Sequence, residues 1–210
     1  MRPVPDLSHI LWLGGSSCAG KTAVARLLAA EHGLPLYACD EAFAEHRRRA
    51  DPDRQPSFCR VGDLPAHELW GRSVEDQVSD LLVFYREEFP LIVEDLLALP
   101  ADGPLLVEGT GLLPDEVAQL APDPRRSLFL VATPGFRRRR YPQRGAWVAE
   151  LLAQCERPEE AFERWMARDD ALARFRRERI AARGQAEIVV DGERTIAETA
   201  AAAAQHFDLK

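Results

Sequence analysis

The chain of 210 residues is long enough to enclose one substantial hydrophobic core, and its 46% hydrophobic and 29% charged residues are typical of a globular protein. A net charge of -7 argues against a nucleic-acid-binding protein, because such proteins need a basic face to displace counterions from phosphates. Four cysteines stand far apart without metal-ligand spacing, and no segment reaches the roughly 20 apolar residues that span a bilayer, so we expect a reduced, cytoplasmic protein without a membrane partner.

The first predicted elements alternate between apolar runs and glycine-bounded turns. Residues 9–13 form a short apolar run that ends at two glycines, which indicates a buried strand. Residues 22–32 carry apolar side chains at helical spacing, and Gly33 is a natural end for a helix. A second strand is predicted at 34–39. This order of strand, glycine loop, helix and strand is typical of a parallel sheet covered by helices.

The middle of the chain shows less regular patterning. Residues 41–72 contain three prolines among many charges, so we predict an irregular segment in which a mobile lobe is inserted. A helical pattern then runs from Ser73 to Pro90. Because proline interrupts a helix interior, a separate helical piece is predicted at 91–99.

The second half of the chain contains three further apolar runs. They predict strands at 104–107, 127–132 and 188–190. Continuous apolar runs, in place of alternating ones, are expected for strands that are covered on both faces. A long helix is predicted at 158–182, with its end at Gly184, and a closing helix at 195–207 with Thr195 as its cap.

An eight-residue motif joins the first predicted strand to the first predicted helix. Its residues are Gly15, Ser16, Ser17, Cys18, Ala19, Gly20, Lys21 and Thr22, which match G-x-x-x-x-G-K-[ST]. Glycines let successive backbone N–H groups turn inward around phosphate oxygens, and the start of the helix adds partial positive charge. Lys21 supplies an ammonium group to the outer phosphates, and the Thr22 hydroxyl can bind Mg²⁺. The motif predicts nucleotide binding; the alternative is an accidental turn before a helix.

Residue usage adds to the prediction of a nucleotide site. Of the 27 basic residues only Lys21 and Lys210 are lysine, so the lysine inside the motif indicates a need for a compact ammonium group. The chain contains no asparagine, which excludes the N-K-x-D guanine signature of many GTPases and favours ATP. Cys18 is interpreted as a small spacer in the loop, with a redox role as the alternative.

Further motifs follow the phosphate-loop motif along the chain. They are Glu108-Gly109, the turn Thr133-Pro-x-Phe136 with Tyr141 and Arg144, and the stretch Trp165-Met-x-x-Arg168-Asp169. With the phosphate loop, they make the chain resemble the nucleoside-monophosphate-kinase-like branch of the P-loop kinases, which includes shikimate, gluconate, adenylylsulfate and chloramphenicol kinases. They are more closely similar to bacterial 2-phosphoglycerate-kinase-like or nucleoside-kinase-like proteins.

The resemblance implies a particular architecture. It is a three-layer α/β P-loop kinase fold, with a five-stranded parallel sheet in the order 2-3-1-4-5 and helices on both faces. Residues 1–210 would form a single domain with an inserted helical acceptor-binding lobe at about 41–99 and a lid at about 134–170. The implied partners are a nucleotide and a small-molecule acceptor, and the implied assembly is a monomer or a homodimer.

Two carboxylates take candidate roles from the resemblance. Asp40 follows the second strand, where several such kinases place the base that receives the acceptor hydroxyl's proton, and Glu41 is the alternative base. The simpler interpretation of Asp40 is a helix cap. Glu108 stands at the carboxyl end of a buried strand, where it would hold the water shell of Mg²⁺ or contact the acceptor. The simpler interpretation of Glu108 is a structural carboxylate bound to backbone N–H groups.

Arginines gather where the resemblance places the lid. In the run 137–140, helical spacing puts Arg137 and Arg140 on one face with Arg144, and we expect one or two of these arginines to stabilise the transferring phosphoryl group. A solvated charged face is the alternative. Arg168 is a further lid candidate that would bind the nucleotide, while Trp165 and Met166 are predicted core residues.

Weaker assignments concern two other places. The turn at 191–194 lies where relatives often contact adenine through backbone groups. His46 and Arg47 in the inserted lobe have two interpretations, which are binding of an anionic acceptor and, more simply, a solvated surface.

Together these features predict a kinase that uses ATP and Mg²⁺ to phosphorylate a hydroxyl of a small molecule, such as a nucleoside, a sugar or glycerate derivative, or an antibiotic. One alternative is a switch or binding module that binds and slowly hydrolyses ATP without such an acceptor. A lesser alternative is a polynucleotide end kinase, which the net charge disfavours.

Overall fold

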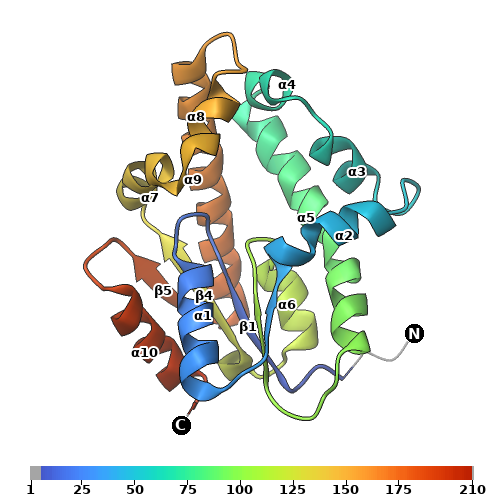
Figure 1. The fold of residues 1–210 in the computed structure, drawn as a ribbon, viewed down its shortest axis with the longest axis vertical. Helices are drawn as coiled ribbons and strands as arrows, with labels where there is room; N and C mark the ends of the chain where they lie inside the picture. Colours follow the sequence, from blue (N-terminus) through green and yellow to red (C-terminus); the bar gives the residue numbers. More distant parts are fainter. Residues whose placement is uncertain (1–5, 210) are drawn as a thin grey trace.

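The computed structural model describes residues 6–209, which form a five-stranded parallel sheet with helices on both faces (Figure 1). The strands are β1 (Ile10–Gly15), β2 (Leu36–Ala38), β3 (Leu105–Glu108), β4 (Ser127–Ala132) and β5 (Ala186–Val190). They lie in the order β2-β3-β1-β4-β5, and each neighbouring pair is parallel. The predicted α/β fold and the predicted strand order are therefore confirmed.

Helices account for most of the remaining chain. In chain order they are α1 (Lys21–His32), α2 (Cys39–Arg49), α3 (Pro56–Gly62), α4 (Ala66–Gly71), α5 (Val74–Ala98), α6 (Pro114–Leu120), α7 (Pro134–Arg140), α8 (Ala146–Leu152), α9 (Pro158–Arg183) and α10 (Ile196–His206). Two 3₁₀ helices, η1 (Pro124–Arg126) and η2 (Tyr141–Arg144), complete the set. No helix among the described residues combines the length and the apolar character needed to cross a bilayer.

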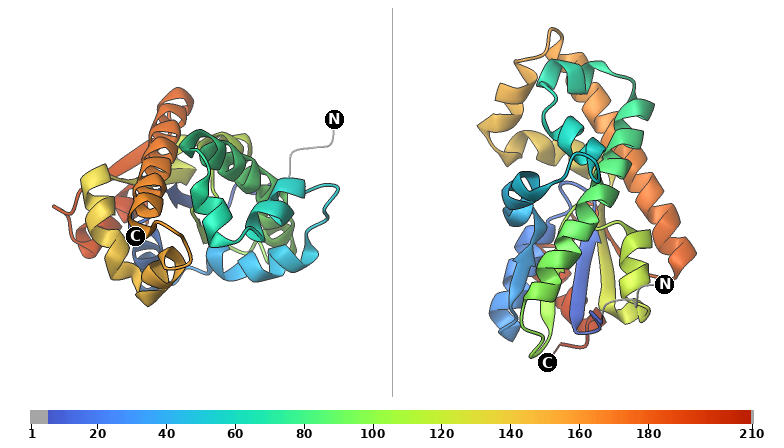
Figure 2. Two further views of the ribbon diagram at one scale, coloured as in Figure 1. Left: turned by 90° about the horizontal axis from the view of Figure 1, so that it is seen from above. Right: turned by 90° about the vertical axis from the view of Figure 1, so that its right-hand side faces the viewer.

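The sheet separates two apolar cores. On one face Trp12 and Phe129 pack with side chains of α5, α6 and α9, and on the other Leu13 and Leu130 pack with α1 and α10. Figure 2 shows α1 on one side of β1 and α6 and α9 on the other. Because successive strand residues point to opposite faces and both faces are covered, every residue of β1 and β4 is apolar or small and buried.

The segment predicted to be irregular contains three short helices. The prediction for 41–72 is wrong, because α2, α3 and α4 lie within or begin just before this range. These helices are too short to be stable alone, and the apolar contact of Phe58 and Val61 with Phe84 and Leu91 of α5 supports them. Tertiary packing of this kind leaves little periodicity in the sequence.

Helix α5 passes through Pro90 without ending. The predicted break at this residue is wrong, since a single helix runs from Val74 to Ala98. Pro90 is exposed, so the backbone carbonyl that loses its partner can be hydrated, whereas Phe89, Leu91 and Ile92 are buried in the core. Burial on both sides of the proline outweighs its cost to the helix, which is about 3 kcal/mol.

Local signals at other helix ends are confirmed. Gly33 and Gly184 adopt left-handed conformations, with φ of 62° and 65°, and terminate α1 and α9. Thr195 caps α10 and forms a capping box with Glu198. These ends fix the lengths of the helices that surround the sheet.

An aromatic cluster joins α4 to η2, α8 and α9. Trp70 of α4 stacks on Trp165 of α9, with ring centroids 4.3 Å apart and an interplanar angle of 21°. Tyr141 of η2 and Val148 of α8 belong to the same buried cluster. The 41–99 and 134–170 segments, which are far apart in sequence, therefore touch each other above the carboxyl edge of the sheet (Figure 1).

Candidate active site

The phosphate-loop motif forms the connection between β1 and α1. Three of its residues have positive φ: Gly15 at 134°, Cys18 at 61° and Gly20 at 78°. A Cβ atom at Gly15 would lie 2.0 Å from the backbone oxygen of Leu130, so only glycine fits there. The predicted strand, loop and helix surround this motif as the motif requires.

Hydrogen bonds to β4 hold the beginning of the loop in place. The backbone N–H of Ser16 donates to the oxygen of Leu130 at 2.9 Å. The Ser16 hydroxyl accepts from the backbone N–H of Ala132 at 2.8 Å. An accidental turn would not need these long-range ties, so they favour the functional interpretation of the loop.

Lys21 is a buried ammonium group at the start of α1. It is 7% exposed, and its Nζ donates to the backbone oxygen of Ser16 at 2.9 Å. Burial lowers the pKa of Lys21 to about 8, against the opposing effects of Glu108 and Asp40. Arg176 and Arg144 lower this pKa further. Two carboxylates and two guanidinium groups are thus close enough to Lys21 to influence its charge.

Glu108 and Thr22 meet beside the phosphate loop. Glu108 ends β3, between β1 and β2, and its side chain is buried; its Oε1 accepts a hydrogen bond from the Thr22 hydroxyl at 3.0 Å. Burial raises the pKa of Glu108, although Lys21 and Thr22 oppose this. The observed partner of Glu108 is the Thr22 side chain. This contact does not support the simpler interpretation, in which Glu108 binds backbone N–H groups.

The donor set at this point suits Mg²⁺. A hydroxyl and a carboxylate are hard oxygen ligands, and Mg²⁺ usually binds one or two carboxylates together with substrate phosphates and water. Within residues 6–209 no three His, Cys, Asp or Glu side chains are grouped so as to hold a metal by themselves. Thr22 and Glu108 therefore fit an ion that would also need nucleotide oxygens.

Asp40 lies in the first turn of α2, directly after β2. It is exposed, and it does not cap the helix, because α2 begins at Cys39 and has no side-chain capping bond. The interpretation of Asp40 as a cap is therefore wrong. Its influence on the pKa of Lys21 and Glu108 places its carboxylate near both. Glu41, the alternative base, instead pairs with Arg26 at the surface at 3.1 Å.

The three lid arginines are distributed differently from the prediction. Arg137 is fully buried, pairs with Asp170 and donates to the backbone oxygen of Ala132 at 2.7 Å. Arg140 is exposed and donates to Gln143. Arg144 belongs to η2 and not to α7, because Pro142 prevents the helix from continuing. The predicted shared helical face is wrong, and a catalytic role for any of the three stays a prediction.

Arg144 nevertheless acts on groups of the loop, and Arg168 lies in the aromatic cluster beside it. Arg144 is within 5.5 Å of the ring centroids of Tyr141 and Trp147, and it influences the pKa of both Cys18 and Lys21. Arg168 is buried, pairs with Asp169 at 2.7 Å and lies 4.5 Å from the ring centroid of Trp70. Trp165 and Met166 are buried, as predicted.

Asp169 is an unpredicted member of the site. It is buried on α9, accepts a hydrogen bond from the Tyr141 hydroxyl at 2.7 Å and pairs with Arg168. Burial opposes its ionisation, yet Arg168 and Tyr141 hold the pKa of Asp169 below its ordinary value. Burial also raises the pKa of the Cys18 thiol, so this thiol has little thiolate character, in keeping with the spacer interpretation.

Arg176 is a second residue that sequence reasoning missed. It lies on α9 with 2% exposure, donates to the backbone oxygen of Thr110 at 2.7 Å and is 5.6 Å from the ring centroid of Tyr85. A signal was present, because Arg176 stands midway between Leu172 and Ile180 on the apolar stripe of the predicted helix. A charged residue at such a position indicates a buried polar site.

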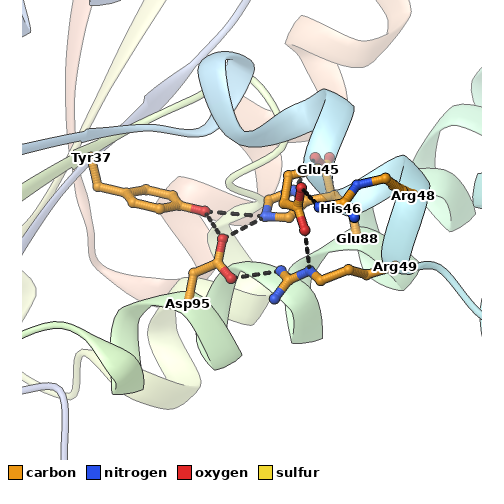
Figure 3. A network of polar contacts seen from close by, with 7 residues as sticks. All are labelled: Tyr37, Glu45, His46, Arg48, Arg49, Glu88 and Asp95. Atoms are coloured by element: carbon orange, nitrogen blue, oxygen red, sulfur yellow. Dashed lines mark hydrogen bonds and ion pairs between the residues drawn. The ribbon is translucent and has the colours of Figure 1, made fainter.

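A polar network beside the site ties α2 to α5 (Figure 3). His46 is fully buried, with Nδ1 3.1 Å from Glu88 and Nε2 3.0 Å from Asp95. The Tyr37 hydroxyl donates to Asp95 at 2.7 Å. Arg47 bonds to the backbone oxygen of Cys59 at 3.0 Å, so the expectation of a solvated surface for these residues is wrong.

The turn at 191–194 lies beside the phosphate loop and α7. A Cβ at Gly20 would lie 3.0 Å from the Ile196 side chain, and one at Gly192 would lie 2.9 Å from Phe136. This placement is compatible with the predicted contact to adenine, which stays a prediction.

Comparison with known proteins shows the fold. No protein-family model matches the chain, and no curated protein matches it. An uncharacterised protein from Eubacterium ventriosum is similar over 96% of this chain and 98% of its own, with 14% identity and a TM-score of 0.50. YorR from Bacillus subtilis, solved with phosphorylated GDP, is 14% identical over 95% and 96% of the two chains, with a TM-score of 0.46. A sugar kinase from Janibacter is 17% identical over 95% and 94%, with a TM-score of 0.41.

Proposed function

We propose that this chain is an Mg²⁺- and ATP-dependent kinase that transfers the terminal phosphoryl group to a hydroxyl of a small molecule. The observation that carries the proposal is the loop at 15–22, whose strained backbone is bonded to β4 and ends at a buried lysine. Backbone strain and a buried ammonium are both costly, and phosphate binding at a helix start would use both.

The neighbouring side chains support a division of roles. The loop amides and Lys21 would hold the phosphates, while Thr22 and Glu108 would position Mg²⁺ and its water shell. When bound, the ion would neutralise charge on the outer phosphates. Asp40, exposed beside Lys21, would orient the acceptor hydroxyl and receive its proton. Arg144 would add positive charge near the group that is transferred.

The first test is substitution of the loop lysine. Lys21→Met should reduce phosphoryl transfer by at least about 100-fold, because it removes the ammonium group while preserving much of the side chain's apolar volume. The assay would follow loss of ATP and appearance of phosphorylated product, with mass spectrometry, across a panel of nucleosides, sugars, glycerates and antibiotics.

The control variant is Lys210→Met, which removes the other lysine at a position remote in sequence from the motif. It should leave nucleotide affinity and turnover unchanged. Full transfer by Lys21→Met would refute the role of the loop. ATP hydrolysis without any phosphorylated product would instead favour a nucleotide-dependent switch.

A further inference from the structure

Arg176 differs from the other buried arginines in its partners. Arg137, Arg168 and Arg176 are buried, and within the described part of the chain the first two form ion pairs with Asp170 and Asp169. No carboxylate lies within ion-pair distance of Arg176 among residues 6–209. Its Nε is buried without a hydrogen-bond partner. Within residues 6–209, Arg176 is therefore a buried guanidinium group that forms no ion pair with a carboxylate.

An unneutralised buried cation is unfavourable for folding. Removing a charge from water costs several kcal/mol unless an opposite charge and hydrogen bonds replace the lost solvation. Thr110 supplies one carbonyl, and Tyr85 supplies its ring and a side-chain hydrogen bond. Asp169 also favours the cation, but its carboxylate is paired with Arg168, and burial still lowers the pKa of Arg176. Arginine presents several donors in a planar fork that matches a carboxylate or a phosphate, so an anionic ligand would supply the missing charge.

The surroundings of Arg176 belong to the acceptor side of the site. Its contacts are to the segment after β3 and to α5, and no hydrogen bond to the phosphate loop is present. It lowers the pKa of Lys21, so its guanidinium is close enough to act on this ammonium group. The side chain of Glu88 is close by, since a Cβ at Gly111 would lie 3.2 Å from both Glu88 Oε2 and the Tyr85 ring.

We propose that Arg176 and Tyr85 form a subsite for an anionic group of the phosphoryl acceptor. The acceptor is then a small hydroxy acid or phosphomonoester, and not an uncharged sugar or nucleoside. The anionic group binds the guanidinium, and the hydroxyl to be phosphorylated faces Asp40 and Lys21. This inference rests on the proposed kinase function and narrows its substrate class.

The experiment separates the acceptor subsite from the nucleotide site. The protein is first saturated with Mg²⁺ and AMP-PNP, and inorganic phosphate is then titrated by calorimetry as the probe. The wild type should bind phosphate at millimolar concentration, and Arg176→Gln should bind it at least tenfold more weakly. The affinity of Arg176→Gln for Mg-AMP-PNP should stay within about twofold of the wild type, because a charge-assisted hydrogen bond to the nucleotide would cost more than that.

Two further variants act as controls. Arg174→Gln removes an exposed arginine from the same helix and should leave phosphate binding unchanged. Arg176→Lys keeps the charge and should retain more phosphate affinity than Arg176→Gln. Phosphate should also raise the melting temperature of the wild type and not that of Arg176→Gln, a readout that remains interpretable if the variant's basal stability changes.

Three results would overturn the proposal. They are the absence of phosphate binding to the saturated wild type, equal phosphate affinity in Arg176→Gln, and a loss in that variant of Mg-AMP-PNP affinity instead of phosphate affinity. The last result would assign the guanidinium to the terminal phosphate of the nucleotide. Each leaves the kinase proposal standing if the wild type binds Mg-AMP-PNP, whereas failure of that nucleotide to bind would refute the kinase proposal itself.

Discussion

Lys21 carries its charge in an environment that disfavours the charge. Burial lowers its pKa to about 8, and its Nζ donates to an uncharged acceptor, the backbone oxygen of Ser16. Anionic phosphates would stabilise the ammonium form and raise this pKa again. At pH values at which Lys21 of the free protein has lost its proton, binding of a nucleotide should therefore be coupled to proton uptake.

The coupling predicts a pH dependence of nucleotide affinity. Below pH 8 Lys21 is mostly protonated and affinity should be nearly constant, whereas at pH 9 the free site must first take up a proton, which weakens Mg-AMP-PNP binding by about tenfold. Calorimetry at several pH values, in buffers of different ionisation enthalpy, measures both the affinity and the protons taken up. The arginine of Lys21→Arg cannot lose its proton in this range, so the affinity of that variant should not change with pH. A decrease in its affinity at pH 9 as large as that of the wild type would contradict the explanation.

Gly15 gives a second prediction at this scale. Gly15→Ala should lower the free energy of unfolding by at least about 2 kcal/mol, because φ is 134° and the new Cβ would meet the oxygen of Leu130 at 2.0 Å. It should also abolish nucleotide binding, since the loop must move to make room. Gly103→Ala is the matched control, because a Cβ there meets nothing within 4 Å. Denaturant unfolding measures the stability of both variants. An equal loss of stability in Gly15→Ala and Gly103→Ala would contradict this account.

Among the helices, α2 is connected to α5 by charged groups as well as by the rings of Phe43 and Phe84. His46 stands between Glu88 and Asp95, and Arg49 also pairs with Asp95 at 2.6 Å. Burial disfavours the imidazolium, but the two carboxylates outweigh this and raise the pKa of His46. Because Asp40 lies on the first turn of α2, this network fixes the helix that presents the candidate base.

The raised pKa makes this connection sensitive to pH. A group whose folded pKa is raised stabilises the fold fully below its unfolded pKa, about 6.5 for histidine, and loses this effect as pH rises through the folded value. His46→Gln should cost about 3 kcal/mol at pH 6, because Glu88 and Asp95 lose the charge between them. The cost should diminish at alkaline pH.

Denaturant unfolding of the wild type and His46→Gln from pH 6 to pH 9 tests this. His67→Gln, at an exposed site in α4, should show no comparable loss. A difference between wild type and His46→Gln that grows with pH would contradict the assignment of a charged His46.

The elements that the sequence predicts well are those with local signals. The strands, the loop at 15–22 and the glycine and threonine helix ends follow from apolar runs and capping residues. Helices α2 to α4 were missed because contacts with α5 and α9 stabilise them, and such contacts leave no periodic pattern. Within the site, Lys21, Thr22 and Glu108 were predicted together, whereas the role of Arg176 depends on how α9 packs against α5 and the segment after β3.

At the scale of the whole molecule, the contact between α4 and α9 lies beside the phosphate loop. Trp70 stacks on Trp165, and Arg168 lies over the Trp70 ring. Cys18 of the loop packs against the same cluster. We expect a nucleotide to reach the loop when this contact opens, so the stability of the cluster should limit the rate of entry.

Trp70→Ala should therefore speed nucleotide association. Loss of an aromatic stack worth about 1 kcal/mol would raise the open population, and with it the association rate of a fluorescent ATP analogue, by about fivefold. Stopped-flow fluorescence measures this rate, and circular dichroism checks that the variant is folded. Leu97→Ala is the control, because Leu97 of α5 is 53% exposed and does not belong to the cluster of Trp70 and Trp165. An association rate that Trp70→Ala leaves unchanged would mean that nucleotide entry does not require this contact to open.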